Sequence, residues 1–253
     1  MIKAIGSFAC FCIKHDGLPF YVATQEGIVV KKPVFYTEIA YVLGVLLLAL
    51  ATALMEQGAF GMSIVVAPAY VVHLKLVEMW SWFSFGVAEF VCQTMVLAIT
   101  FIIVGRVRLT WLLAFGTTAL YSLALDGFLL VTALIPTLLA VRIAVYVLGF
   151  ALCVTAVGLI LHGYLPPSAY DLYAKLVTAK TGRPLSVVKT TYDLVSLAVA
   201  VGLSLWFFGG IRGVGVGTVA GALLGGICIR RMMEWLGRLF DFRDRLPWRR
   251  HFE

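Results

Sequence analysis

Residues 38–57 read EIAYVLGVLLLALATALMEQ, a run whose acidic side chains lie only near its two ends, at Glu38 and Glu56. Between them only Tyr41 and Thr52 carry a polar group. The hydrocarbon core of a bilayer is about 30 Å thick and an α-helix rises about 1.5 Å per residue, so about 20 apolar residues cross it. The run therefore predicts a helix that spans a membrane.

Five more runs of this kind follow along the chain, at residues 83–104, 109–131, 139–162, 190–208 and 212–230. Of the 253 residues, 62% are hydrophobic and only 13% are charged, and the mean hydropathy is +0.99. Soluble domains are roughly half apolar and a quarter charged, and a water-soluble fold has too little interior to bury this much apolar surface. These features predict an all-α polytopic membrane protein with six transmembrane helices in contact with the lipid bilayer.

Two shorter apolar segments, residues 62–76 and 166–180, interrupt the series of spans. The first contains Pro68 and the second begins with Pro166 and Pro167, and both are too short to cross a bilayer. Each predicts a short helix that either re-enters the membrane or lies on its surface.

The two ends of the chain differ from the spans. Residues 1–37 are interpreted as a short cytoplasmic extension, in which the runs 21–24 and 27–30 predict a hairpin. Residues 231–253 are rich in arginine, and apolar positions there alternate with basic ones at helical spacing. This pattern predicts a basic amphipathic tail at the membrane surface.

The chain contains an internal similarity. The residues Tyr41-Val42-Leu43-Gly44 recur 105 positions later as Tyr146-Val147-Leu148-Gly149. Matching positions at the same or a slightly smaller offset include Ala51 with Ala156, Gly58 with Gly163, Ser63 with Ser168 and Glu89 with Asp193. We therefore predict two repeats, residues 38–133 and 134–230, each with three spans and one short helix. Because three is an odd number, the two repeats must be inverted relative to each other.

Basic residues gather on one side of the predicted membrane. With six spans both termini lie on the same side, and that side holds seventeen of the 20 Lys and Arg residues. The other side holds only Lys75, Arg142 and Arg212. The positive-inside rule therefore predicts cytoplasmic termini and a multi-pass location in the inner (plasma) membrane. Because the basic residues lie beside apolar runs, the positive net charge indicates anionic lipid headgroups, and a nucleic-acid partner is not expected.

Three stretches carry a likeness to a known family. They are Gly61-Met62-Ser63 leading to Ala67-Pro68-Ala69-Tyr70, Pro166-Pro167-Ser168-Ala169-Tyr170-Asp171, and Gly213-Val214-Gly215-Val216-Gly217-Thr218. Over about residues 38–230 the chain resembles the YczE/YyaS/YitT family of prokaryotic integral membrane proteins. It departs from that pattern at Ile64, where many relatives have proline, and at Lys189, where arginine is more frequent. The resemblance implies a membrane fold with two repeats and implies little about a substrate, because that family is poorly characterised.

Ionisable side chains within spans are costly and therefore mark candidate site positions. Glu89 and Gln93 share one face of the second span, and no basic residue lies within a turn of Glu89. Asp126 has a structural alternative in a pair with Arg142, and Asp193 has one in a pair with Lys189. The predicted substrate-binding or coupling residues are Ser63, Glu89, Gln93, Asp126, Ser168, Tyr170, Asp171 and Asp193.

The repeats, the short helices and Glu89 together predict a small-solute transporter or permease, with its site between the repeats near the membrane midplane. The alternative is a scaffold or regulatory factor that binds a protein partner through the basic tail. The sequence contains no recognisable catalytic motif or nucleotide loop. Cys10 and Cys12, with His15 close by, could hold a metal, and they are interpreted instead as reduced cytosolic thiols. We therefore predict no enzyme activity, no metal and no cofactor. The expected partners are the bilayer and a small polar or charged solute, and a homo-oligomer is compatible with the sequence.

Overall fold

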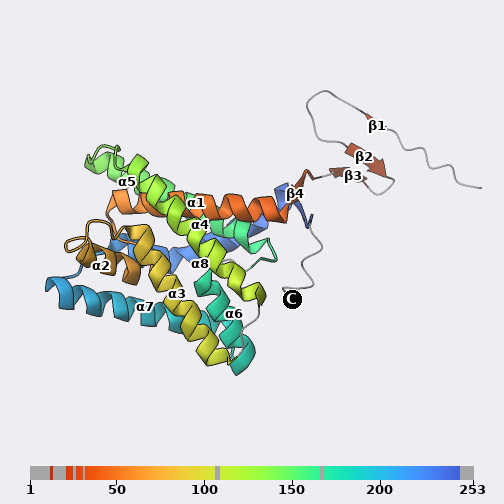
Figure 1. Ribbon diagram of the computed structural model, residues 1–253. Helices are drawn as coiled ribbons and strands as arrows, with labels where there is room; N and C mark the ends of the chain where they lie inside the picture. The colour runs from red at the N-terminus through yellow and green to blue at the C-terminus, as the bar shows by residue number, and fades with distance from the viewer. Residues whose placement is uncertain are drawn as a thin grey trace, which may run out of the picture.

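The structure, a computed structural model, describes the backbone of residues 12–13, 21–24 and 27–30, and then residues 32–105, 109–165 and 168–245, with the backbone alone at 109–112 and 186. Eight α-helices form within these residues (Figure 1): α1 Thr37–Gly58, α2 Ala67–Leu76, α3 Phe85–Val104, α4 Leu109–Thr132, α5 Leu139–Leu161, α6 Ala169–Thr181, α7 Leu185–Phe208 and α8 Val216–Leu239. All except α2 and α6 are long and apolar enough to cross a membrane. The prediction of an all-α protein with six spans is confirmed.

The strands are few and short. β2 (Tyr21–Thr24) pairs antiparallel with β3 (Gly27–Val30), as the predicted hairpin requires, and β1 (Cys12–Ile13) pairs with β2. β4 (Val34–Tyr36) and β5 (Asp241–Arg243) form a parallel pair that joins the start of α1 to the end of α8. This pair ties the two ends of the helical part of the chain together.

Helix α8 continues past the predicted end of the last span. It extends without a break to Leu239, so the boundary placed at residue 230 lies within one helix. Leu236 is buried in a cluster with Ala40 of α1 and Leu159 of α5, and Met232 packs against the same cluster. The apolar face assigned to a separate surface tail is therefore partly used for packing inside the protein.

Helices α1 and α5 pack closely against each other along the bundle. A Cβ atom at Gly44 would lie 3.0 Å from the carbonyl oxygen of Ala156, and one at Gly149 would lie 3.0 Å from that of Ala51. Small residues at a helix interface let two backbones approach this closely. The internal similarity matches Gly44 with Gly149 and Ala51 with Ala156, so the two contacts involve matched residues.

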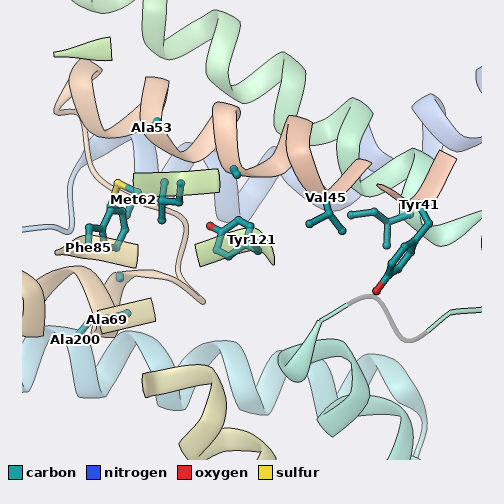
Figure 2. Packing of buried hydrophobic residues seen from close by; sticks show 12 residues of the cluster. Tyr41, Val45, Ala53, Met62, Ala69, Phe85, Tyr121 and Ala200 are labelled. Atoms are coloured by element: carbon teal, nitrogen blue, oxygen red, sulfur yellow. The ribbon is translucent and has the colours of Figure 1, made fainter. Parts of the chain in front are cut away.

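The main core lies on the inner side of α1 (Figure 2). Val45 and Ala53 of α1 meet Phe85 of α3, Tyr121 of α4 and Ala200 of α7 in one buried cluster. Met62, Ala67 and Ala69 from the segment around α2 join the same cluster. One short helix therefore starts inside the core that the long helices form.

Both short helices begin in the interior and end at the surface. The first residues, Ala67 of α2 and Ala169 of α6, are 0% exposed. At their other ends, Lys75 of α2 lies over the ring of Phe208, the last residue of α7, and Lys180 of α6 donates a hydrogen bond to the carbonyl of Ile103 near the end of α3. The start of each short helix is therefore packed inside the protein, and its other end contacts the end of a long helix.

Candidate functional site

Glu89 occupies the first turns of α3 and is 0% exposed. Its Oε1 atom accepts two hydrogen bonds, one from Gln93 Nε2 at 3.1 Å and one from the hydroxyl of Tyr170 at 3.0 Å. Its Oε2 atom has no hydrogen-bond partner among the described residues. A carboxyl group in this position is only half satisfied, which is costly in a buried site.

The partners of Glu89 come from several helices. Gln93 lies one turn further along α3, and its Oε1 accepts a hydrogen bond from Thr118 of α4 at 2.9 Å. Tyr170 belongs to the first turn of the short helix α6, and its ring lies 5.9 Å from that of Tyr192 on α7. Four helices, α3, α4, α6 and α7, therefore meet around one acidic side chain.

A second polar layer joins α1 to α4 beside this cluster. Thr52 of α1 and Tyr121 of α4 share a buried hydrogen bond of 3.0 Å, and Tyr41 and Thr117 share another. Sequence reasoning missed these residues and also Thr118 and Tyr192. The signal for α4 was present in the sequence, because Thr117, Thr118, Tyr121 and Ser122 follow helical spacing within an apolar run.

No Lys or Arg makes an ion pair with Glu89 in the part of the chain that the structure describes. Burial raises the pKa of the Tyr170 hydroxyl, and the adjacent Glu89 raises that pKa further. Tyr170 therefore keeps its proton and acts as a donor to Glu89. A proton or a cationic group is needed to neutralise a carboxylate that is buried in this way.

Asp126 of α4 makes two hydrogen bonds at the start of α3. Its Oδ2 accepts a hydrogen bond from Ser84 Oγ at 2.5 Å and its Oδ1 accepts one from the backbone N–H of Gly86 at 2.7 Å. It thus satisfies donors at the start of α3. The alternative pair with Arg142 is wrong, because Arg142 donates to the carbonyl oxygen of Gly58 and lies over the ring of Phe60.

We expect Asp126→Ala to lower the free energy of unfolding by about 1–3 kcal/mol, because the donors that it satisfies would lose their acceptor. Asp126→Asn keeps one side-chain oxygen as an acceptor and should therefore lower the free energy of unfolding by less. Thermal unfolding of the purified variants in detergent measures both effects. If Asp126→Ala unfolded at the wild-type temperature and lost transport, Asp126 would belong to the site and not to the scaffold.

The residues at the start of α6 also make contacts within the protein. Ser168 caps the helix by accepting a hydrogen bond from the backbone N–H of Asp171 at 3.2 Å. Asp171 forms an ion pair of 3.2 Å with Lys189 of α7. Lys189 therefore makes its ion pair with Asp171, while the Oδ1 atom of Asp193 is buried without a hydrogen-bond partner among the described residues.

The structure thus brings together only part of the predicted set. Glu89, Gln93 and Tyr170 form one hydrogen-bonded cluster. Ser63 is half-buried before α2, where its carbonyl oxygen accepts hydrogen bonds from the N–H groups of Val66 and Ala67. The side chains of Cys10, Cys12 and His15 lie outside the described part of the chain. Within the described part there is no cluster of three or more potential metal ligands.

Comparison with known protein families gives a match over most of the chain. A model described as a family of unknown function (DUF6198) matches residues 35–234. Neither the curated proteins nor the solved structures contain a match to this chain. The match covers every helix described above except the last few residues of α8.

Proposed function

The chain belongs to the DUF6198 family of unknown function, and from the geometry around Glu89 we propose that it is a permease that moves a small polar or charged solute across the membrane. The observation that carries this proposal is the fully buried Glu89 carboxyl, with one oxygen unpartnered among the described residues. An ionisable group inside a membrane protein costs several kcal/mol and is retained where it takes part in transport. The short helix α6, which contacts Glu89 through Tyr170, supports the same conclusion, because interrupted or short helices often lie at transport sites.

Glu89 would carry a proton that is coupled to movement of the solute. Its surroundings are filled, because it is 0% exposed and is contacted from α3 and α6. A solute would require those helices to separate before it reached the carboxyl, whereas a proton needs only a transient water chain. Tyr170 would keep the carboxyl oriented while the proton is bound or released.

Two inverted repeats would supply the moving parts. Gly44 faces Ala156, and Gly149 faces Ala51. Because the 105-residue offset matches Gly44 with Gly149 and Ala51 with Ala156, these two contacts are equivalent in the two halves. In the same way α2 packs against α7 while α6 packs against α3. Such reciprocal contacts are expected where two halves are related by a two-fold axis in the membrane plane, and rocking of one half against the other gives alternating access.

The location in the plasma membrane with cytoplasmic termini remains part of this proposal, and it rests on the distribution of basic residues. The likeness to the YczE/YyaS/YitT family, the lack of enzyme activity and the assembly into homo-oligomers likewise remain predictions. The contacts of the tail do not favour the scaffold alternative. Up to Arg245 the tail is engaged within the chain, since β5 pairs with β4 and the backbone N–H of Arg245 donates to Glu38.

The test is a proton-movement assay in liposomes that contain the purified protein and a pH-sensitive dye. Amines, amino acids, vitamins, inorganic anions and nucleosides are added in turn outside. We expect at least one solute class to change the internal pH in protein-containing liposomes and not in empty ones. If labelled solutes enter at a rate independent of the pH gradient, Glu89 carries no coupling proton, and if none enters, the permease proposal fails.

A further inference from the structure

A cavity of about 460 Å³ opens between the end of α1, the start of α2 and the connection from α7 to α8. Its lining does not include Glu89, Gln93 or Tyr170, and it does include Glu56, Phe60, Tyr70 and Leu74 together with residues 211–216. None of these residues was predicted as part of a site. The volume is within the range of pockets that hold small organic molecules.

The walls of this cavity are held in place by the backbone. The N–H group of Met62 donates to the carbonyl of Gly213 at 3.0 Å, and the N–H group of Gly217 donates to that of Phe60 at 2.9 Å. Gly61 has a φ of +105°, and a Cβ atom there would lie 2.5 Å from the backbone nitrogen of Gly215. The two connecting segments are therefore locked together, so the cavity is formed before any ligand arrives.

Glu56 supplies the charge in this cavity. Its Oε1 accepts a hydrogen bond from the hydroxyl of Tyr70 at 3.3 Å, and no Lys or Arg of the described residues lies within ion-pair distance of its carboxylate. Burial raises the pKa of Tyr70, and the charge of Glu56 raises it further, so the phenol remains a donor. The carboxylate keeps the capacity to accept further hydrogen bonds from a cationic ligand.

Two basic residues nearby each lie over an aromatic ring. The guanidinium group of Arg142 lies 5.4 Å from the ring centre of Phe60, and that of Arg212 lies 4.5 Å from the ring centre of Phe208. Arg212 is also one of the residues that line the cavity, so it is the basic residue available to an anionic group on a ligand that extends along the cavity. Tyr70 belongs to the lining too, and an ammonium group is attracted both by a carboxylate such as that of Glu56 and by an aromatic ring such as that of Tyr70.

We propose that this cavity is a binding site for a small solute that carries an ammonium group, with the ammonium on Glu56 and the apolar part between Tyr70, Leu74 and Phe60. A simple amine and a zwitterionic amino acid share this chemistry. They differ in that only the amino acid has a carboxylate for Arg212 to bind. Binding at this site stands apart from transport and does not require Glu89.

The test uses the full chain, purified in detergent, and equilibrium binding of radiolabelled phenethylamine and of radiolabelled phenylalanine. We expect at least one of them to bind, and Glu56→Gln to weaken binding by at least about tenfold, because a charge-assisted hydrogen bond is lost. Phenylpropionate, which lacks the ammonium group, should not compete. If phenylalanine binds and phenethylamine does not, the amino-acid form of the proposal holds, and Arg212→Gln should weaken that binding too.

Glu78→Gln is the matched control, because Glu78 is an exposed carboxylate just beyond α2 that pairs with Lys75 and does not line the cavity. Equilibrium binding in detergent needs no pH gradient, so it succeeds or fails independently of the proton-movement assay, which separates this proposal from the permease proposal. Thermal unfolding shows that each variant is folded. The proposal is overturned if neither amine binds to the wild type, if folded Glu56→Gln binds as the wild type does, or if phenylpropionate competes equally.

Discussion

Glu89→Gln should reduce proton-coupled solute movement by at least about 100-fold and leave the fold intact. The amide has nearly the same shape as the carboxyl, and its oxygen can still accept the hydrogen bonds from Gln93 and Tyr170. What the amide cannot do is bind and release a proton at neutral pH, and removing a proton-transferring group typically costs about 10²–10⁴ in rate. The effect should therefore be large on transport and small on stability.

The measurement is the internal pH change in liposomes, with thermal unfolding of the same preparation as the check on folding. Glu89→Asp retains an ionisable group and should recover part of the wild-type rate, and Glu78→Gln, at an exposed ion pair, should match the wild type. Undiminished proton movement in folded Glu89→Gln would remove Glu89 from the mechanism. A variant that fails to fold would show that the carboxyl is needed for packing, and Glu89→Asp would then decide its role in transport.

The spans could be predicted because their signal is local. A run of about 20 apolar residues is sufficient to indicate each long helix, whatever the rest of the chain does. The same criterion misplaced the start of α7, which begins at Leu185 directly after Pro184. Lys189 and the threonines beside it lower the hydropathy of the first turns, although Pro184 is a residue that often precedes the body of a helix.

The site could be predicted only where its members are neighbours on one helix. Glu89 and Gln93 are four residues apart on α3, and this spacing indicates a shared face. The contact with Tyr170 joins residues 81 positions apart and depends on the packing of α6 against α3. The capping role of Asp126 depends in the same way on the approach of α4 to the start of α3, 40 positions away. The sequence shows where such carboxylates are, but it does not show which of them stabilise the fold and which belong to a functional site.

Gly149→Val should destabilise the protein by about 3 kcal/mol, the upper end of the usual cost of overpacking a tight interface. A Cβ atom at this position would lie 3.0 Å from the carbonyl oxygen of Ala51 and 3.1 Å from the Cβ atom of Leu54. The branched side chain adds two further carbon atoms on the same side, and the backbone of α1 cannot rotate away from them. For a chain of this size, about 3 kcal/mol corresponds to a fall of about 10 °C in the temperature of unfolding.

The control is Gly127→Val, because a Cβ atom at this position in α4 would meet no other atom within 4 Å. It should leave the unfolding temperature within a few degrees of that of the wild type. An equal fall in both variants would mean that valine disturbs the helices themselves, and the tight α1–α5 contact would not be the cause.

Gly44→Val extends this test to the proposed repeats. Gly44 faces Ala156 and Ile160 of α5, in the position that corresponds to Gly149 facing Ala51 of α1. If a two-fold axis relates the halves, the two substitutions disturb equivalent contacts at the two ends of one interface, so they should lower the unfolding temperature by similar amounts. A large fall for one glycine and none for the other would mean that the resemblance of the two halves in sequence does not extend to equivalent packing, and the rocking mechanism would lose its structural basis.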